Sequence, residues 1–182
     1  IESCDNYRIT RYAITGFPFK SVKIPFRLIQ ELSKFVPTQI AQVHNWIHFK
    51  NADNVIYSCR DFFGDYPDLS FFVGFDGKEL NFPVDILSSI DRAEVLATEE
   101  LTKDRLIEIH LSKNELKVKS QSEHGWYKES FRIRYADKEL SFKVSSRILS
   151  DILTHFKKAT LSDDTARLKF ETENFVHVIS VQ

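Results

Sequence analysis

The sequence predicts an α+β fold of repeated β-α-β-β-β units, with the helices on one face of antiparallel sheets. The first observation is an amphipathic pattern in residues 140–156, where a strand-like run precedes apolar residues at Ile148, Leu149, Ile152, Leu153 and Phe156. This spacing puts one apolar stripe on a helix. The second observation is that alternating, β-branched sequence follows the helix, which is typical of strands.

The third observation is that this pattern occurs three times. Residues 80–96 and 22–36 repeat the order of strand, helix start and apolar stripe. Phe142, Phe82 and Ile24 occupy equivalent places, which gives spacings of 60 (142 minus 82) and 58 (82 minus 24) residues. A repeat of this length indicates that one supersecondary unit has been copied along the chain.

In the first unit, glycine and proline residues bound the predicted elements. A strand over residues 7–14 ends at Gly16, and a short strand over 22–24 leads to Pro25, which suits the first turn of a helix. Pro37 then ends that helix. Three strand-like runs and a loop complete the unit, at 41–43, 46–49, 55–59 and 61–68.

The second and third units follow with the same order of elements. Pro83 begins a helix that is predicted to reach about Thr98. The third helix is expected to begin at Ser145 or Ser146, either of which can cap it, and to end near residues 157–158. The predicted strands of the two units are 80–82, 106–111, 116–120, 127–135, 140–144, 167–171 and 176–181.

The connections between the units predict the domain organisation. A tight turn at residues 136–138 joins the second and third units, so we expect them to share one domain. The first unit has no complete partner, because only the strand over residues 7–14 precedes it. An unpaired unit would leave a sheet edge and an apolar helix face exposed. We therefore expect that the chain is a fragment of a longer protein that has further sequence on the N-terminal side.

The composition narrows the class of protein. At 182 residues, with 42% hydrophobic residues and sixteen Phe, the chain can bury a packed core in one or two domains. The formal net charge of -1 excludes a global attraction to nucleic acid or membrane, so any DNA contact needs a local patch. Cys4 and Cys59 lack CxxC spacing, and no apolar run reaches the roughly 20 residues that span a bilayer. Without a signal segment, we expect a soluble intracellular protein.

An enzyme or a metal site would depend on two groups of side chains, namely Asp61, Asp65 and Asp68, or His110, His124 and His177. The acidic loop lacks the Asp-x-Asp-x-Asp-Gly order of a calcium loop, and the histidines lack the HExxH spacing of a zinc site. The sequence contains neither a GxSxG motif nor a Gly-rich phosphate loop. We therefore predict no catalysis, no metal and no cofactor.

Several segments resemble the motifs of one family, in the same order along the chain. They lie at residues 3–9, 22–32, 58–68, 125–131 and 142–153. Residues 3–9 are S-C-D-N-Y-R-I where the family has A-T-D-G-H-R-L, and residues 142–153 resemble its F-N-x-x-Y-L-x-D-x-L helix. The chain is thus similar to the bacterial DNA sliding clamp, the beta subunit of DNA polymerase III, as a C-terminal fragment or a divergent member.

The resemblance implies a DNA clamp fold, with the second half of a middle domain in residues 1–72 and a complete C-terminal domain in residues 73–182. It implies a processivity factor, a homodimeric ring that encircles duplex DNA and tethers polymerase and clamp-loader subunits through short peptide motifs. Such a subunit is non-catalytic, cytoplasmic and associated with the nucleoid. The alternative is a clamp-like interaction protein or decoy that binds replication partners without encircling DNA.

In a sliding clamp the helices line the hole, so the resemblance implies that basic side chains on the helices contact phosphates. The candidates are Lys23, Arg27, Lys34, Arg92, Arg147, Lys157 and Lys158. The alternative for each residue is a role in solubility alone, because Lys and Arg usually lie on the polar face of an amphipathic helix. Glu31 and Asp151 on the same helices reduce the positive charge.

The family binds partner peptides in an apolar groove between its middle and C-terminal domains. The matching positions are Cys4, Asn6, Tyr7, Arg8, Ile9, Pro67, Phe71, Phe72, His177, Ile179, Ser180, Val181 and Gln182. Asn6-Tyr7 replaces the usual Gly-His pair, and residues 179–182 replace the M-P-M-R-L end. Loss of the Pro and both Met residues changes the pocket, so the peptide preference can differ from the usual one. Ile179 and Val181 could equally be ordinary edge-strand residues.

Overall fold

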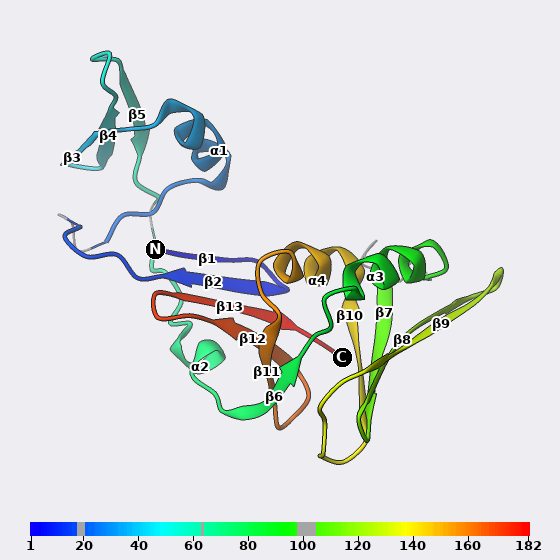
Figure 1. Ribbon diagram of the computed structural model, residues 1–182. Coiled ribbons are helices and arrows are strands. Elements are labelled where there is room, and N and C mark those ends of the chain that lie inside the picture. Colours follow the sequence, from blue (N-terminus) through cyan, green and yellow to red (C-terminus); the bar gives the residue numbers. More distant parts are fainter. Residues whose placement is uncertain (18–20, 63, 98–104) are drawn as a thin grey trace. The chain divides into compact units, whose positions relative to one another are not determined.

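The computed structural model of the protein describes residues 1–17, 21–62, 64–97 and 105–182. The chain divides into two compact units. Unit 1 comprises Ile1–Ala13 and Leu69–Gln182, and unit 2 comprises Ile14–Asp68 (Figure 1). All the strand pairs that the structure describes are antiparallel, so the predicted α+β class with antiparallel sheets is confirmed. The predicted domain boundary after residue 72 stays a prediction.

Unit 1 contains two copies of the β-α-β-β-β repeat. The first copy consists of β6 (Gly77–Asn81), α3 (Ile86–Val95), β7 (Leu106–Ser112), β8 (Glu115–Ser122) and β9 (Gly125–Arg132). The second consists of β10 (Leu140–Ser145), α4 (Ser146–Leu153), β11 (Lys158–Ser162), β12 (Arg167–Glu171) and β13 (Phe175–Ser180). The helix of the second copy begins 60 residues after that of the first (146 minus 86), as the repeat predicts.

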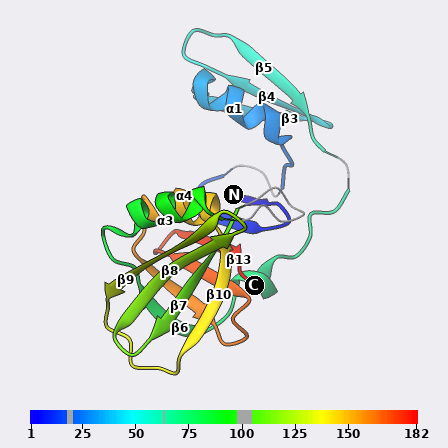
Figure 2. The same cartoon turned by 90° about the vertical axis from the view of Figure 1, so that its right-hand side faces the viewer.

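The two copies exchange their first strands. Strand β10 pairs with β7 of the first copy, which gives a four-stranded sheet in the order β10-β7-β8-β9 (Figure 2). Strand β6 pairs with β11 of the second copy. A hairpin of β1 (Glu2–Cys4) and β2 (Arg8–Tyr12) adds to β13, so the other sheet has the order β1-β2-β13-β12-β11-β6.

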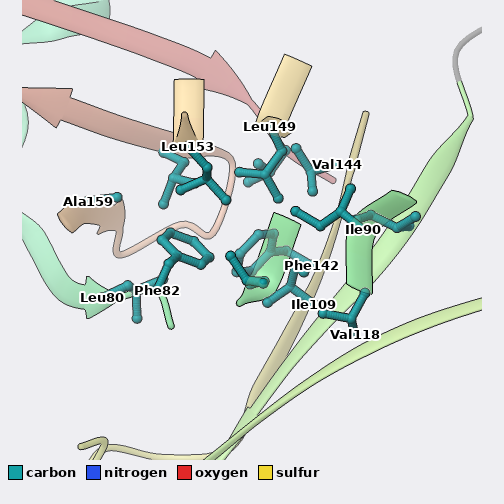
Figure 3. Packing of buried hydrophobic residues seen from close by; sticks show 14 of the residues in the cluster. Leu80, Phe82, Ile90, Ile109, Val118, Phe142, Val144, Leu149, Leu153 and Ala159 are labelled. Atoms are coloured by element: carbon teal, nitrogen blue, oxygen red, sulfur yellow. The ribbon is translucent and has the colours of Figure 1, made fainter. Parts of the chain in front are cut away.

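Helices α3 and α4 lie side by side (Figures 1 and 2), and both contribute residues to the buried cluster of unit 1. The predicted stripe of α4 is confirmed for Ile148, Leu149, Ile152 and Leu153, which are all buried. Leu149 and Leu153 pack with Phe82 and Phe142, one from each copy (Figure 3). Ser145 caps α4, since its hydroxyl accepts a hydrogen bond of 3.4 Å from the Ile148 amide.

Unit 2 contains α1 (Phe26–Phe35) and a three-stranded sheet in the order β3 (Gln39–Val43), β4 (Trp46–Lys50), β5 (Ile56–Arg60). Its buried cluster is small and consists of Leu32, Ile47 and Phe49, with partly buried apolar neighbours. Phe26 at the start of α1 is 74% exposed. This unit therefore buries much less apolar surface than unit 1.

Two expected elements differ from the structure. Residues 22–24 form no strand, because Lys23 bonds to the loop instead: its amide donates to Asp61 Oδ1 (2.7 Å) and its carbonyl accepts from the Phe62 amide (3.1 Å). The structure adds a one-turn helix that was not predicted, α2 (Ser70–Val73). The predicted end of the second helix at Thr98 lies outside the described residues.

The second difference concerns the end of α4. The helix ends at Leu153, so Lys157 lies beyond it and Lys158 begins β11. The cause is the packing of Phe156, whose ring stacks on Phe175 at 5.1 Å between centroids. This contact requires the chain to leave the helix and enter the sheet, where Ala159 is buried. The expected helix end near residues 157–158 is therefore wrong.

Gly77 lies where β6 of the first copy comes very close to β11 of the second copy. A Cβ atom at this position would lie 2.0 Å from the Leu161 carbonyl oxygen on β11. Because the obstacle is backbone, Gly77→Ala has to displace β6 and should lower the free energy of unfolding by about 2 kcal/mol or more. Urea unfolding measures this loss. Asp76→Ala, an exposed neighbour, is the control, and equal stability of the two variants would contradict the strand exchange.

Candidate functional site

The turn between β1 and β2 holds several of the predicted pocket residues. Asp5 Oδ1 accepts hydrogen bonds of 2.8 Å from the amides of Tyr7 and Arg8, and Oδ2 accepts one of 3.0 Å from Arg8 Nε. Burial acts to raise the pKa of the Asp5 carboxyl, but these hydrogen bonds outweigh it and the pKa is lowered. The Tyr7 carbonyl accepts a bond of 2.7 Å from the Ser180 amide, which ties the turn to the end of β13.

A small cavity of about 30 Å³ lies beside this turn. Tyr7, Ser180 and Gln182, which the sequence singled out, line it together with Leu106, Lys143, Val144, Ser145 and Ile148. Gln182 reaches the cavity because its amide and carbonyl bond to the Lys143 carbonyl (2.9 Å) and amide (2.6 Å). Sequence analysis missed the last five residues. All of them except Leu106 lie in the motif recognised at residues 142–153. No local pattern in the sequence shows that Gln182 pairs with this segment.

Alternation along β13 separates the other pocket residues onto two faces of the sheet, since residues paired across strands share a face. Ile179 pairs with Arg8 and Leu168, and it is completely buried in the core of unit 1, as is nearly all of Val181. The opposite face carries Ile9, paired with Val178, and Ser180, paired with Arg167. Ile179 belongs to β13, which lies between β2 and β12, and Val181 follows the end of this strand, so the interpretation of the two as edge-strand residues is wrong.

His177 lies on the same face as Ile179 and belongs to the junction between β2 and β13. Its Nδ1 is 2.8 Å from Thr10 Oγ1, and its ring stacks on Phe175 at 6.2 Å. Burial lowers the pKa of the His177 imidazole, and Arg8 lowers it further, while Asp5 opposes both. Burial and Arg8 therefore both favour the neutral form of the imidazole.

The two phenylalanines of the predicted pocket lie on α2, which packs against β13. Phe71 is 75% exposed and Phe72 46% exposed, and the two rings meet edge to face at 5.6 Å. Cys4, the last residue of β1, is exposed, and so is Asn6, which follows that strand. Pro67 is an exposed residue of unit 2. Unit 1 thus brings together the turn, the end of β13 and α2.

Comparison with known proteins identifies the architecture. A scan against protein-family models and a search of curated proteins found no match. Among solved structures, the DNA polymerase sliding clamp of Pseudomonas aeruginosa matches all of this chain with a TM-score of 0.83 and 18% identity. The clamp (DNA polymerase III subunit beta) of Bartonella birtlesii, bound to griselimycin, matches with a TM-score of 0.84 and 19% identity.

The chain has the sliding-clamp fold. The match covers 100% of this chain but 54% of the Pseudomonas clamp and 53% of the Bartonella clamp, so the chain spans about half the length of these solved proteins. The resemblance in the motifs is thereby confirmed at the level of fold. The residue assignments that it implied stay predictions.

The clamp fold presents the candidate DNA-contacting residues in different surroundings. Arg27 and Lys34 are exposed on α1, where Lys34 Nζ lies 3.5 Å from Glu31. Lys23 precedes that helix and is partly buried. Arg147 is exposed in the first turn of α4. Arg27, Lys34 and Arg147 are therefore accessible enough to contact a phosphate.

Lys157, Lys158 and Arg92 bind carbonyl or carboxylate groups of the protein. Lys157 Nζ donates a hydrogen bond of 2.5 Å to the Leu153 carbonyl at the end of α4, and Lys158 lies 3.6 Å from Glu79 on the neighbouring strand. Arg92 on α3 binds β9 of the clamp fold, with Nη2 2.6 Å from Glu129 Oε2 and Nε 2.9 Å from the Tyr127 hydroxyl. A phosphate would have to compete with these contacts.

The part of the chain that the structure describes contains no cluster of metal-ligating side chains. No three His, Cys, Asp or Glu side chains among residues 1–17, 21–62, 64–97 and 105–182 gather closely enough to hold a metal ion. The Asp61 carboxylate accepts a hydrogen bond from the Lys23 amide, and His110 Nδ1 lies 2.8 Å from Ser141 Oγ. The described helices of this clamp fold are also too short, or too polar, to cross a membrane.

The burial of Ile179 predicts that it stabilises the fold. Ile179→Ala leaves a cavity in the core and should lower the free energy of unfolding by about 2–5 kcal/mol. Ser180→Ala, at the exposed next position, is the control and should change it by less than about 0.5 kcal/mol. Urea unfolding separates the two, and a stable Ile179→Ala variant would show that the side chain lies outside the core.

The contacts of Glu129 predict an acid-dependent loss of stability. Hydrogen bonds lower the pKa of Glu129 to about 2, with the largest effect from Tyr127 and the next largest from Arg92. A pKa that is lower in the folded state stabilises the fold at pH values above the unfolded-state pKa of about 4.3. This contribution is lost as the pH falls toward the folded-state pKa. The stability difference between wild type and Glu129→Gln should therefore be constant from about pH 7 to 5 and shrink below about pH 4.3, as measured by urea unfolding. Glu173→Gln is the exposed control, and a difference that does not depend on pH would contradict this network.

Proposed function

We propose that this chain is part of a DNA sliding clamp, a processivity factor that encircles duplex DNA and tethers polymerase and other replication or repair proteins. The observation that supports this most is the match of the whole chain to solved sliding clamps, with TM-scores of 0.82 to 0.84. The repeated unit supports it as well, because a ring of similar domains needs a module that is copied. The clamp acts without catalysis, in the cytoplasm and on the nucleoid.

The tethering site consists of the turn after β1, the end of β13 and α2. Tyr7, Phe71 and Phe72 supply exposed aromatic surface, which suits the hydrophobic anchors of a short partner peptide. Ser180 and Gln182 supply polar groups beside the cavity. Two of the solved clamps were bound to griselimycin, which supports a ligand site on this fold.

The DNA-binding function rests on the basic residues of the helices. Arg27 on α1 and Arg147 on α4 are exposed, and their charge would contact phosphates without selecting a sequence. A homodimeric ring would repeat these contacts around the duplex. Loose contacts of this kind let a ring slide.

A second candidate is a clamp-like interaction protein that binds replication partners without encircling DNA. The ion pairs favour it, because Lys34, Arg92 and Lys158 lie 3.5, 2.6 and 3.6 Å from carboxylate oxygens. The net charge of -1 adds no general attraction to DNA. Both candidates share the peptide site, and they differ in retention on closed circular DNA.

The peptide site predicts that Phe72→Ala weakens partner binding. Removal of an exposed aromatic anchor should raise the Kd about 5- to 30-fold for a fluorescent polymerase-derived peptide with hydrophobic anchors, because such anchors carry most of the binding energy. Fluorescence anisotropy measures the Kd. Phe26→Ala on α1 removes another exposed phenylalanine, outside the site, and should leave the Kd unchanged. Equal affinity of Phe72→Ala and wild type would refute this site.

A further inference from the structure

The segment that carries the exposed phenylalanines is held on the sheet by cationic side chains. Helix α2 has four residues and no side-chain cap hydrogen bond. A single helical turn is not stable by itself in water, so tertiary contacts have to fix it. Leu69 and Val73 supply some of these contacts, since both are buried.

Arg167 supplies a second set of contacts. Its guanidinium carbon lies 4.7 Å from the Phe75 ring centroid and 5.5 Å from that of Phe71, within the range of cation–π attraction. Its Nη1 donates a hydrogen bond of 3.2 Å to the Phe71 carbonyl, and Nη2 lies 3.4 Å from Asp164 Oδ2. The side chain is 19% exposed. Arg167 therefore contacts both α2 and the segment that follows it.

Lys169 repeats this arrangement two residues along β12. Its Nζ lies 5.2 Å from the Phe75 ring centroid and donates a hydrogen bond of 3.0 Å to the Phe75 carbonyl. Glu171 lies 3.2 Å from the same Nζ and balances its charge. The two cations thus bind one carbonyl within α2 and one just after it.

The sheet register connects Arg167 with the rest of the peptide site. Arg167 is paired with Ser180, and the Ser180 amide bonds to the Tyr7 carbonyl. Ser180 and Tyr7 also line the cavity. Arg167 therefore links α2 to the strand pair that carries Ser180, in addition to the direct packing of α2 against β13.

We propose that Arg167 is a positioning residue of the partner-peptide site, which fixes α2 so that Phe71 and Phe72 lie beside Ser180. This inference rests on the proposed tethering function, and its ligand is a peptide with hydrophobic anchors. A planar guanidinium can stack on two rings and donate to a carbonyl at the same time, which an ammonium group does less well. Arg167→Lys should therefore retain part of the function.

The experiment compares wild type, Arg167→Ala, Arg167→Lys and the exposed control Arg134→Ala. Anisotropy with the fluorescent polymerase-derived peptide should give a Kd about 5-fold higher for Arg167→Ala, an intermediate value for Arg167→Lys and no change for Arg134→Ala. Hydrogen exchange should become faster at the Val73 and Gly74 amides, which bond to Leu69 and Ser70. Exchange in β7 and β8 should stay as in wild type.

The possible outcomes separate this inference from the proposed function. If wild type binds the peptide and Arg167→Ala binds it equally well, Arg167 has no positioning role. Unchanged exchange at Val73 and Gly74 in Arg167→Ala would show that Arg167 does not fix α2. Faster exchange in β7 and β8 would show a general loss of stability, which also overturns the positioning role. If wild type does not bind the peptide, the proposed tethering function fails, and the assignment of Arg167 to that site fails with it.

Discussion

Exchange of the first strand between the two repeats is the constraint on which unit 1 depends. Strand β6 completes the sheet of the second repeat, and β10 completes that of the first. Without the exchanged strands, β7 and β11 would each have an unpaired edge. The exchange also puts α3 and α4 next to each other, so both helices bury their stripes in one core. In unit 2, the described residues contain a single helix and three strands, and the buried cluster is correspondingly small.

The same arrangement creates the candidate site. Because β13 is an interior strand, its core-facing residues are buried and stabilise the fold, whereas Ser180 on the opposite face is exposed. The β1–β2 hairpin, α2 and β10 approach this strand end from three places in the sequence. Under the proposed function, peptide binding and folding therefore depend on neighbouring residues of one strand. Only variants on the exposed face can report on binding alone.

The repeat pattern predicted much of this fold, because the periodicity of apolar residues records which face each element buries. Strand β12 occurs at residues 167–171 as predicted, and the stripe of α4 is buried as expected. The pattern could not show that first strands are exchanged, since either pairing satisfies the alternation. It also placed Lys158 on a helix, because a local period does not reveal that Phe156 packs against the sheet.

The candidate site was predicted in part. Motif matching placed Tyr7, Ser180 and Gln182 together, and the structure brings them to one cavity. It also grouped them with Ile179, because a match by position ignores the alternation that turns successive side chains to opposite faces. Arg167 was not predicted, because its hydrogen bond to Phe71 joins residues 96 positions apart. A contact of that range leaves no trace in the local periodicity of the sequence.

The clamp function is tested most directly by retention on DNA of different topology. The protein that carries this chain in its natural reading frame would be loaded on a nicked circular plasmid and separated from free protein by gel filtration. A sliding ring should stay on the circle and be lost after the plasmid is cut once with a restriction enzyme. Equal retention on the circular and the linear plasmid would contradict topological binding and leave the non-encircling interaction protein as the better account.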